Sequence, residues 1–329
     1  MDIAYVLPTS WACGGIHAVY YQANELIARG HGVTVFSPVA EAAEGFPLKA
    51  QFRTIPAPSA AAEQFDVLVH VREMYRMPGA ICARRNFLLL QDKDHLLVSG
   101  AKRSALLRDY ADPSLNILAV SEWLAQFVRE KCANNNVQII GNGVDAGRYF
   151  PDEVRRERMR LLIEGDFPDP MRNVIEAIEV ANRVRQHQRV QIWALGRRFA
   201  TPGKTVDAVF ENASEDQIPG IYRQCDLLIK TAIIEGFGRP FLEAMACGCV
   251  PATYASGGLA EFCRHDENSL VTGVGNVSLL VWHILRFLGD ERLRDRLRAN
   301  AIQTARSMPW SRVAEKLESA FRRGLGEEA

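Results

Sequence analysis

Two glutamates, Glu235 and Glu243, stand with seven residues between them around a glycine-rich turn and a proline. Pro240 suits the first turn of a helix, because its missing N–H costs nothing there. Gly248 suits the helix end, where a left-handed residue is usually needed. The segment therefore predicts a loop, then a short helix of about two turns, then an apolar strand at residues 250 to 253.

The start of that helix is a candidate anion site. The backbone N–H groups of residues 241 to 243 are expected to be free there and to meet the positive end of the helix dipole. Gly236 and Gly238 would let backbone amides approach a ligand closely, because no Cβ stands in the way. Glu235 would then face a polyhydroxylated ligand beside the phosphate. This combination predicts a sugar-nucleotide site.

The segment from Glu235 to Gly248 resembles the E-x7-E signature of glycosyltransferase family 4, whose members are retaining enzymes of the GT-B fold. Other stretches resemble further stations of the family, in the family's order and over roughly residues 1 to 312. They are Gly14-Gly15, residues 30 to 35, Ser121-Glu122, Asn142 to Asp145 with Phe150-Pro151, and Gly257-Gly258 with Glu261.

The chain also carries the strand pattern that this fold requires. Short apolar runs alternate with helical patterns, which predicts right-handed βαβ units and parallel sheets. The expected strands are residues 2–7, 33–36, 67–71, 87–90, 117–120 and 137–140, and then 161–163, 190–195, 206–210, 227–229, 250–253 and 270–271. Helices are expected over residues 15–29, 278–306 and 310–324.

The resemblance implies an α/β protein of the GT-B class, with two Rossmann-like domains whose parallel sheets face each other across a cleft. Residues 1–155 would form the acceptor-side domain and residues 156–309 the nucleotide-sugar donor domain. Residues 310–329 would be a helix that crosses back to the first domain.

The resemblance also assigns roles to single residues. Glu235 would hold hydroxyls of the donor sugar, Glu243 would take the ribose hydroxyls, and Arg172 would neutralise the leaving diphosphate with its guanidinium fork. Glu235 and Arg172 are the expected catalytic residues. The full expected donor-binding set is Gly14, Gly15, Gly165, Arg172, Glu235, Gly236, Phe237, Gly238, Leu242 and Glu243.

The chain departs from the family's pattern directly after Gly165. Relatives usually carry an arginine there, whereas this chain has Asp166, which would repel a diphosphate. We expect either that an arginine from another loop supplies the charge or that diphosphate binding is weaker. The candidate arginines are Arg197, Arg198 and Arg239.

The acceptor side, or donor-sugar side, is assigned to His17, Gln91 and Asp92. Gln91 stands where many relatives have a histidine, so it could bind a hydroxyl but cannot titrate. His17 is expected either to contact a hydroxyl or to lie at a solvated helix start. Asp92 and Asp94 read as a DxD metal motif, but they fall in the wrong domain and fold, so no metal and no cofactor are expected.

Composition limits the environment and the partners. The balance of 39 Lys and Arg against 39 Asp and Glu argues against nucleic-acid binding. The seven scattered cysteines fit a reducing cytoplasm without disulfides. No apolar run approaches the length of a membrane span, of roughly 18 residues or more. We expect a cytoplasmic protein, and peripheral membrane contact is compatible with this composition.

The sequence therefore predicts a retaining hexosyl- or deoxyhexosyltransferase. Its substrates would be a nucleotide-diphosphate sugar and a hydroxyl of an unknown acceptor, such as a glycan, a glycolipid or a natural product. A catalytically weak or silent sugar-nucleotide binding protein is the alternative suggested by Asp166 and Gln91. A glycoside hydrolase, which also uses two carboxylates, is a further alternative.

Overall fold

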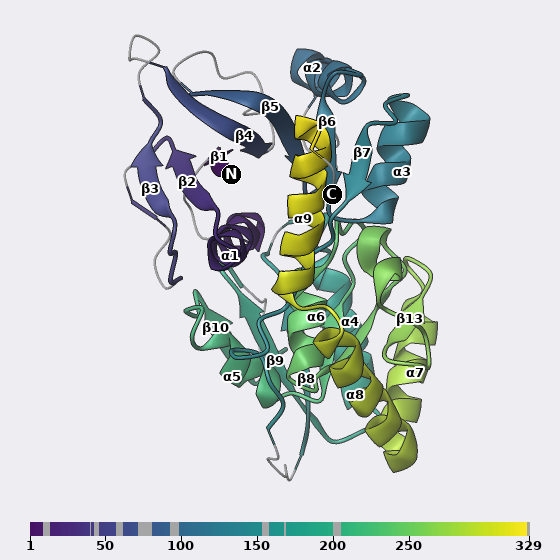
Figure 1. Ribbon diagram of the computed structural model, residues 1–329. Coiled ribbons are helices and arrows are strands. Elements are labelled where there is room, and N and C mark those ends of the chain that lie inside the picture. Colours follow the sequence, from purple (N-terminus) through teal and green to yellow (C-terminus); the bar gives the residue numbers. More distant parts are fainter. Residues whose placement is uncertain are drawn as a thin grey trace. The chain divides into compact units, whose positions relative to one another are not determined.

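The computed structural model describes residues 1–8, 14–39, 41–42, 46–56, 62–71, 81–92, 99–152, 158–167, 169–199 and 205–327. The chain divides into two compact units. Unit 1 contains residues 1–142 and 310–329, and unit 2 contains residues 143–309. Each unit is built on one parallel sheet with its own helices (Figure 1).

Unit 1 contains a seven-stranded parallel sheet in the order β3-β2-β1-β4-β5-β6-β7. The predicted strands are confirmed, and β3 was not predicted because its side chains are mostly polar and exposed, with no apolar run. The strands are β1 (Asp2–Val6), β2 (Gly32–Ser37), β3 (Gln51–Thr54), β4 (Glu63–Val71), β5 (Ile81–Leu90), β6 (Asn116–Ala119) and β7 (Val137–Ile139).

The helices of unit 1 include the last helix of the chain. They are α1 (Gly14–Ala28), α2 (Gly100–Tyr110), α3 (Glu122–Lys131) and α9 (Trp310–Leu325). α9 packs against α1 and β5 (Figure 1). The ring of Trp310 stacks on Tyr21 with centroids 4.9 Å apart, and the ring of Phe321 meets Phe87 at 5.1 Å. α9 is thus an integral part of the unit 1 core.

Unit 2 contains a six-stranded parallel sheet in the order β10-β9-β8-β11-β12-β13. Its strands are β8 (Met159–Glu164), β9 (Val190–Gly196), β10 (Ala208–Glu211), β11 (Leu227–Lys230), β12 (Val250–Tyr254) and β13 (Leu270–Thr272). Its helices are α4 (Val174–Arg185), α5 (Ile218–Arg223), α6 (Arg239–Ala246), α7 (Val277–Gly289) and α8 (Glu291–Arg306), with a 3₁₀ turn, η3, at Gly257–Glu261.

The helical segment predicted over residues 278–306 is broken in the structure. α7 ends at Gly289 and α8 begins at Glu291, with Asp290 between them in an extended conformation. The Asp290 carboxylate accepts a hydrogen bond from the Leu293 amide at 3.0 Å. An aspartate in this position caps the new helix, because its oxygen satisfies one of the N–H groups without an intrahelical partner.

The strand order of unit 2 reverses between β8 and β11, since the chain runs outward from this pair in both directions. In such sheets ligands bind outside the carboxyl ends of the strands at the reversal point. A core of apolar side chains from strands β8, β9, β11 and β12 and from α4, α7 and α8 holds the sheet beneath that point. The expected α/β class with two Rossmann-like parallel sheets is confirmed.

Candidate active site

The loop before α6 enters the helix through a left-handed glycine. Gly238 is the N-cap residue with φ of 90°, and a Cβ built there would lie 2.4 Å from the Leu259 side chain. No residue other than glycine satisfies both requirements at once. α6 covers eight residues with Pro240 in its first turn, and Gly248 follows it with φ of 77°. The predicted short helix and its glycine end are confirmed.

The predicted set of free N–H groups at this helix was wrong. With Gly238 as N-cap, the helix begins at Arg239, so Leu242 and Glu243 lie beyond the first four N–H groups, which lack an intrahelical partner. The Phe241 amide donates to the Gly238 carbonyl at 3.0 Å, which tightens the first turn. The amides that open the helix are therefore those of Gly238 and Arg239.

The backbone of Glu235 is fixed by the η3 turn. The Gly258 amide donates to the Glu235 carbonyl at 2.9 Å. Gly257 has φ of 56°, and a Cβ on it would lie 2.0 Å from the same carbonyl oxygen. The two glycines of the G-G-x-x-E station thus allow the turn to pack directly on the loop that carries Glu235.

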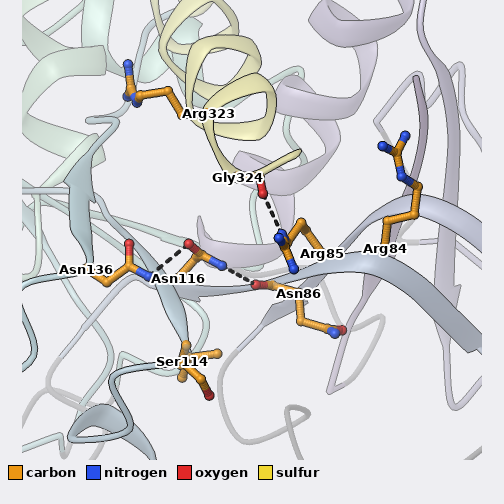
Figure 2. A pocket seen from close by; sticks show the side chains of 9 residues that line it. Arg84, Arg85, Asn86, Ser114, Asn116, Asn136, Arg323 and Gly324 are labelled. Carbon is orange, nitrogen blue, oxygen red and sulfur yellow. Dashed lines mark hydrogen bonds between the residues drawn. The ribbon is translucent and has the colours of Figure 1, made fainter. Parts of the chain in front are cut away.

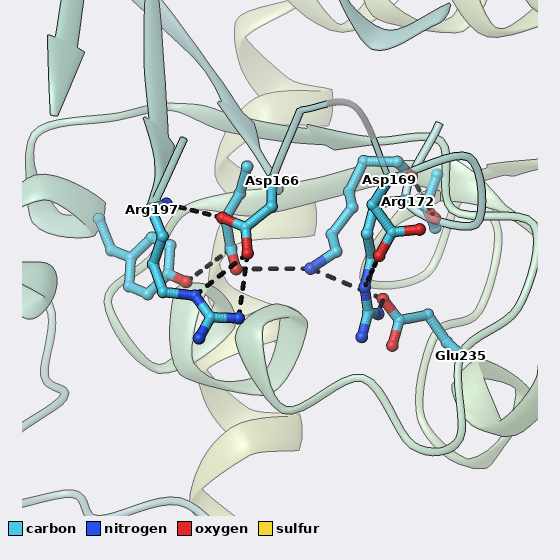
Figure 3. Close-up of polar contacts among 9 residues, drawn as sticks. Asp166, Asp169, Arg172, Arg197 and Glu235 are labelled. Carbon is cyan, nitrogen blue, oxygen red and sulfur yellow. Dashed lines mark hydrogen bonds and ion pairs between the residues drawn. The ribbon is translucent and has the colours of Figure 1, made fainter. Parts of the chain in front are cut away.

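The Glu235 carboxylate is buried and lies in a cluster of charged side chains at the carboxyl ends of β8 and β11. Arg172 Nη1 donates to Glu235 Oε1 at 2.8 Å, as Figure 3 shows, and Lys230 Nζ lies 3.6 Å from the same oxygen. Lys230 also lies 3.4 Å from Glu164 Oε1. Arg172 in turn lies 3.9 Å from Asp169. The structure therefore joins the two predicted catalytic residues directly.

Lys230 and Glu164 belong to this charge cluster, and the sequence analysis did not single them out. Each is the last residue of a strand whose preceding residues are apolar, Leu-Leu-Ile in both cases. The Tyr222 hydroxyl donates to Glu164 Oε2 at 2.8 Å, and burial beside this carboxylate holds the pKa of Tyr222 well above its usual value. One sequence feature could have identified them. Each is a charged residue that ends one of the two strands where the strand order of the sheet reverses.

Asp166, which follows Gly165 at the end of β8, is paired with Arg197. Its carboxylate accepts from the Arg197 backbone amide at 2.6 Å and from Nε at 3.1 Å (Figure 3). Arg197 is one of the three arginines expected to supply charge here. Its guanidinium balances the negative charge of Asp166, at the position where the resemblance led us to expect an arginine.

Glu243 is also paired, with Arg239 one helical turn before it. Arg239 Nη2 donates to Glu243 Oε1 at 2.6 Å, and both side chains are buried. Burial raises the pKa of the Glu243 carboxyl, while the neighbouring guanidinium opposes this effect. Its expected role at the ribose stays a prediction.

Two further members of the expected donor-binding set contribute packing. The Phe237 ring lies 5.2 Å from the Phe262 ring, and the Leu242 side chain is fully buried in α6. Gly236 lies buried between Glu235 and Phe237. Any contact of these residues with a ligand would come from their backbone.

The unit 1 candidates lie where β5 ends and α1 begins. The Gln91 side-chain amide donates to the Gly15 carbonyl at 2.9 Å, and Gly14 is the first residue of α1. His17 is buried and stacks on Phe46 at 5.5 Å. Of its two expected roles, the solvated helix start was wrong, and a contact with a hydroxyl stays a prediction. Asp92 is half-buried, and Asp94 lies outside the described residues.

Within the described ranges, no three His, Cys, Asp or Glu side chains are grouped as a metal site. The six cysteines in these ranges are free thiols, and Cys13 lies outside them. Among the helices described, none has the length and the apolar character needed to cross a bilayer.

Unit 1 also contains a cavity of about 400 Å³ that none of the predicted residues lines. It lies beside the amino ends of β6 and β7 and the last turn of α9 (Figure 2). Arg85 donates to the Gly324 carbonyl, and Asn136 donates to Asn116, as Figure 2 shows. Its lining residues are Arg84, Arg85, Asn86, Ser114, Leu115, Asn116, Asn136, Arg323 and Gly324.

The chain is similar to known glycosyltransferases in sequence and in structure. The family described as Glycosyl transferases group 1 matches residues 202–304. N-acetyl-alpha-D-glucosaminyl L-malate synthase of Bacillus anthracis is 24% identical over 265 residues, which are 71% of this chain and 68% of that protein.

Solved structures share the fold over nearly the whole chain. A glycosyltransferase from Rickettsia africae superposes with a TM-score of 0.77 at 14% identity, covering 99% of both chains. Anabaena HepE, solved in complex with UDP and glucose, superposes with a TM-score of 0.76 at 14% identity, covering 98% of this chain and 100% of that one. These two proteins therefore share the fold described above, with its two parallel sheets.

Proposed function

The chain belongs to the Glycosyl transferases group 1 family, GT4, and we propose that it moves a sugar from a nucleotide-diphosphate sugar to an acceptor hydroxyl with retention of the anomeric configuration. Family membership makes it a glycosyltransferase with a nucleotide-sugar donor. The configuration, the diphosphate donor and the acceptor class are the parts that we propose.

The observation that carries the proposal is the direct contact between Glu235 and Arg172 at the point where the strand order of unit 2 reverses. Glu235 supplies a carboxylate that accepts hydrogen bonds from sugar hydroxyls. Arg172, whose side chain is 35% exposed, supplies a charge that can reach a phosphate. The start of α6 adds N–H groups and a helix dipole that favour an anion.

In the proposed reaction, negative charge develops on the diphosphate as the glycosidic bond breaks. Donors that already point at the leaving group stabilise the transition state most, because they need no reorganisation. Arg172 and the start of α6 have this role. The acceptor hydroxyl attacks from the face that the diphosphate leaves, and the departing phosphate oxygen takes the hydroxyl proton.

The Asp166–Arg197 pair supports this assignment. Asp166 alone would repel a diphosphate and was the main reason to consider a silent binding protein. Arg197 places a guanidinium on that carboxylate, so the local charge is close to zero and not negative. We assign the donor side to unit 2, and the acceptor side to Gln91, His17 and Asp92 of unit 1.

A panel of nucleotide-diphosphate sugars tests the proposal, with slow release of the nucleoside diphosphate as the measurement. Calorimetry with the free nucleoside diphosphates runs in parallel. We expect the wild type to hydrolyse one donor, and Glu235→Gln to hydrolyse it roughly a hundredfold more slowly. The exposed Glu130→Gln on α3 serves as the matched control and should retain the activity.

Two outcomes would contradict the proposal. Tight nucleotide binding with no turnover of any donor would indicate a binding protein. Cleavage of a simple glycoside without any nucleotide would indicate a hydrolase, in which Glu235 and Glu243 would have to flank the scissile bond.

A further inference from the structure

Glu235 has two cationic partners that differ sharply in exposure. The Arg172 side chain is 35% exposed and lies 2.8 Å from Glu235 Oε1. The Lys230 side chain is 4% exposed and lies 3.6 Å from the same oxygen. Within the described chain these are the charged groups at ion-pair distance from Glu235, with Asp169 and Glu164 on their far sides. One partner can meet solvent or a ligand, and the other is enclosed.

Lys230 is held firmly by its surroundings. It ends β11 beside β8, where Ile229 pairs in register with Ile163. Its ammonium lies 3.4 Å from Glu164 and 5.5 Å from the centre of the Phe241 ring. Tyr222 in turn fixes Glu164 by donating a hydrogen bond. An ammonium buried this deeply is tolerated only because carboxylates compensate for its lost hydration.

Arg172 has two tasks if the proposed function holds. It is the nearest cation to Glu235, and it is also the proposed contact of the donor diphosphate. A diphosphate beside Arg172 competes for the guanidinium, so the hold of Arg172 on Glu235 weakens when the donor binds. Glu235, whose side chain is 6% exposed, would then lack a full counter-charge.

We propose that Lys230 is a positioning residue, whose buried ammonium keeps the Glu235 carboxylate oriented while Arg172 serves the diphosphate. This inference rests on the proposed function of the same site. Glu164 is the second carboxylate that contacts the Lys230 ammonium, at 3.4 Å. Lys230 thus serves as the fixed counter-ion of Glu235, and Arg172 serves as the contact of the ligand.

The test compares kcat and KM of donor hydrolysis in Lys230→Met, Lys230→Arg and the double variant Lys230→Met with Glu164→Gln. The double variant removes one charge of each sign, so the fold is not left with a buried unpaired carboxylate at Glu164. Lys102→Met, on the exposed surface of α2, is the matched control and should behave as the wild type.

We expect kcat of the double variant to fall roughly tenfold or more, because a charge-assisted contact is lost. KM for the donor should change less than kcat, because Arg172 and the start of α6 still contact the diphosphate. Lys230→Arg should recover part of kcat, because the positive charge survives. A residue with a structural role alone would lower the amount of folded enzyme and leave kcat per folded molecule unchanged.

A double variant with the wild-type kcat per folded molecule would overturn the inference while leaving the proposed function intact. The same holds if only the yield of folded protein changes. A wild type that neither binds a nucleoside diphosphate nor turns over any donor overturns the proposed function, and the inference with it.

Discussion

The Glu235 cluster of unit 2 and the arginine-lined cavity of unit 1 use the same kinds of side chain in opposite ways. In unit 2 the cations Arg172 and Lys230 face carboxylates, and the cluster is largely buried. In unit 1, Arg85 and Arg323 are exposed and bind neutral partners. Arg85 donates to the Gly324 carbonyl (Figure 2), and Arg323 donates to Gln138 and Ser319. Within the described chain neither of these two arginines pairs with a carboxylate.

This difference in burial and pairing indicates which charged side chains contribute most to the energetics of the molecule. Exposed ion pairs contribute about 0–1 kcal/mol, whereas removing one partner of a buried pair costs about 3–5 kcal/mol. A count of arginines would favour the unit 1 cavity as the anion site. Burial and pairing instead favour unit 2, where each charge is held in place before a ligand arrives.

The largest effect should come from Glu235. Glu235→Gln keeps the size of the side chain and removes its charge, so hydrogen bonds from sugar hydroxyls to the carboxylate weaken. At about 1.5–3 kcal/mol for each such bond, turnover should fall roughly a hundredfold. Affinity for the nucleoside diphosphate should change little, as calorimetry would measure.

The next effect concerns the arginines on the two sides of the comparison. Arg172→Ala should weaken binding of the nucleoside diphosphate roughly ten- to a hundredfold, and binding of the bare nucleoside far less. Arg172→Lys should recover part of the loss, because the charge survives while the fork is lost. Arg85→Ala is the matched control and should leave nucleotide affinity unchanged. If Arg85→Ala weakens binding as much as Arg172→Ala, the assignment of the anion site to unit 2 is wrong.

A smaller effect is expected at Arg197. Arg197→Ala removes the guanidinium that pairs with Asp166, so the Asp166 carboxylate repels an approaching diphosphate. The affinity of the protein for the nucleoside diphosphate should fall about threefold to tenfold. Asp166→Asn in the same background should restore most of the affinity, which a titration with the nucleoside diphosphate would measure. Equal affinity of all three proteins would show that the diphosphate does not approach this pair.

The smallest effect is a pH dependence of stability in unit 1. Burial lowers the pKa of His31, which lies beside Glu318 of α9. A histidine with a lowered pKa favours folding in its neutral form. Its contribution is therefore complete above its unfolded pKa of about 6.5 and declines as the pH falls below that value. His31→Gln should make the unfolding temperature depend less on pH between about pH 7 and pH 5.5. An unchanged pH dependence would exclude His31 as the titrating group.

The sequence predicted most of the helices and strands, and it predicted the order of the segments that form the candidate site. Runs such as Leu161–Ile163 and Leu227–Ile229 are apolar because strands buried on both faces must be, and the structure places both in the sheet core. The Glu235–Arg172 contact was less accessible, since 63 positions separate the two residues. The sequence placed both at one site by resemblance, but it did not predict their ion pair.

The parts that the sequence could not predict are mainly partnerships. Asp166 was interpreted as a repulsive charge with three candidate arginines to offset it. The sequence did not choose among them, because Arg197 is 31 positions away on the next strand's loop. Lys230 and Glu164 were passed over because a charged residue after an apolar run marks only the end of a strand. The helix break at Asp290 was missed because the apolar spacing continues through it, whereas a local cap determines the boundary.

The close approach of Gly257 to the Glu235 carbonyl has a consequence for engineering by loop exchange. The space between them leaves no room for a Cβ, so the segment around Glu235 and the η3 turn form one transplantable module. A chimera that imports residues 233–243 from a relative and keeps the native 256–261, or the reverse, is expected to misplace the carboxylate. Donor-specificity grafts in this chain should therefore exchange both segments together.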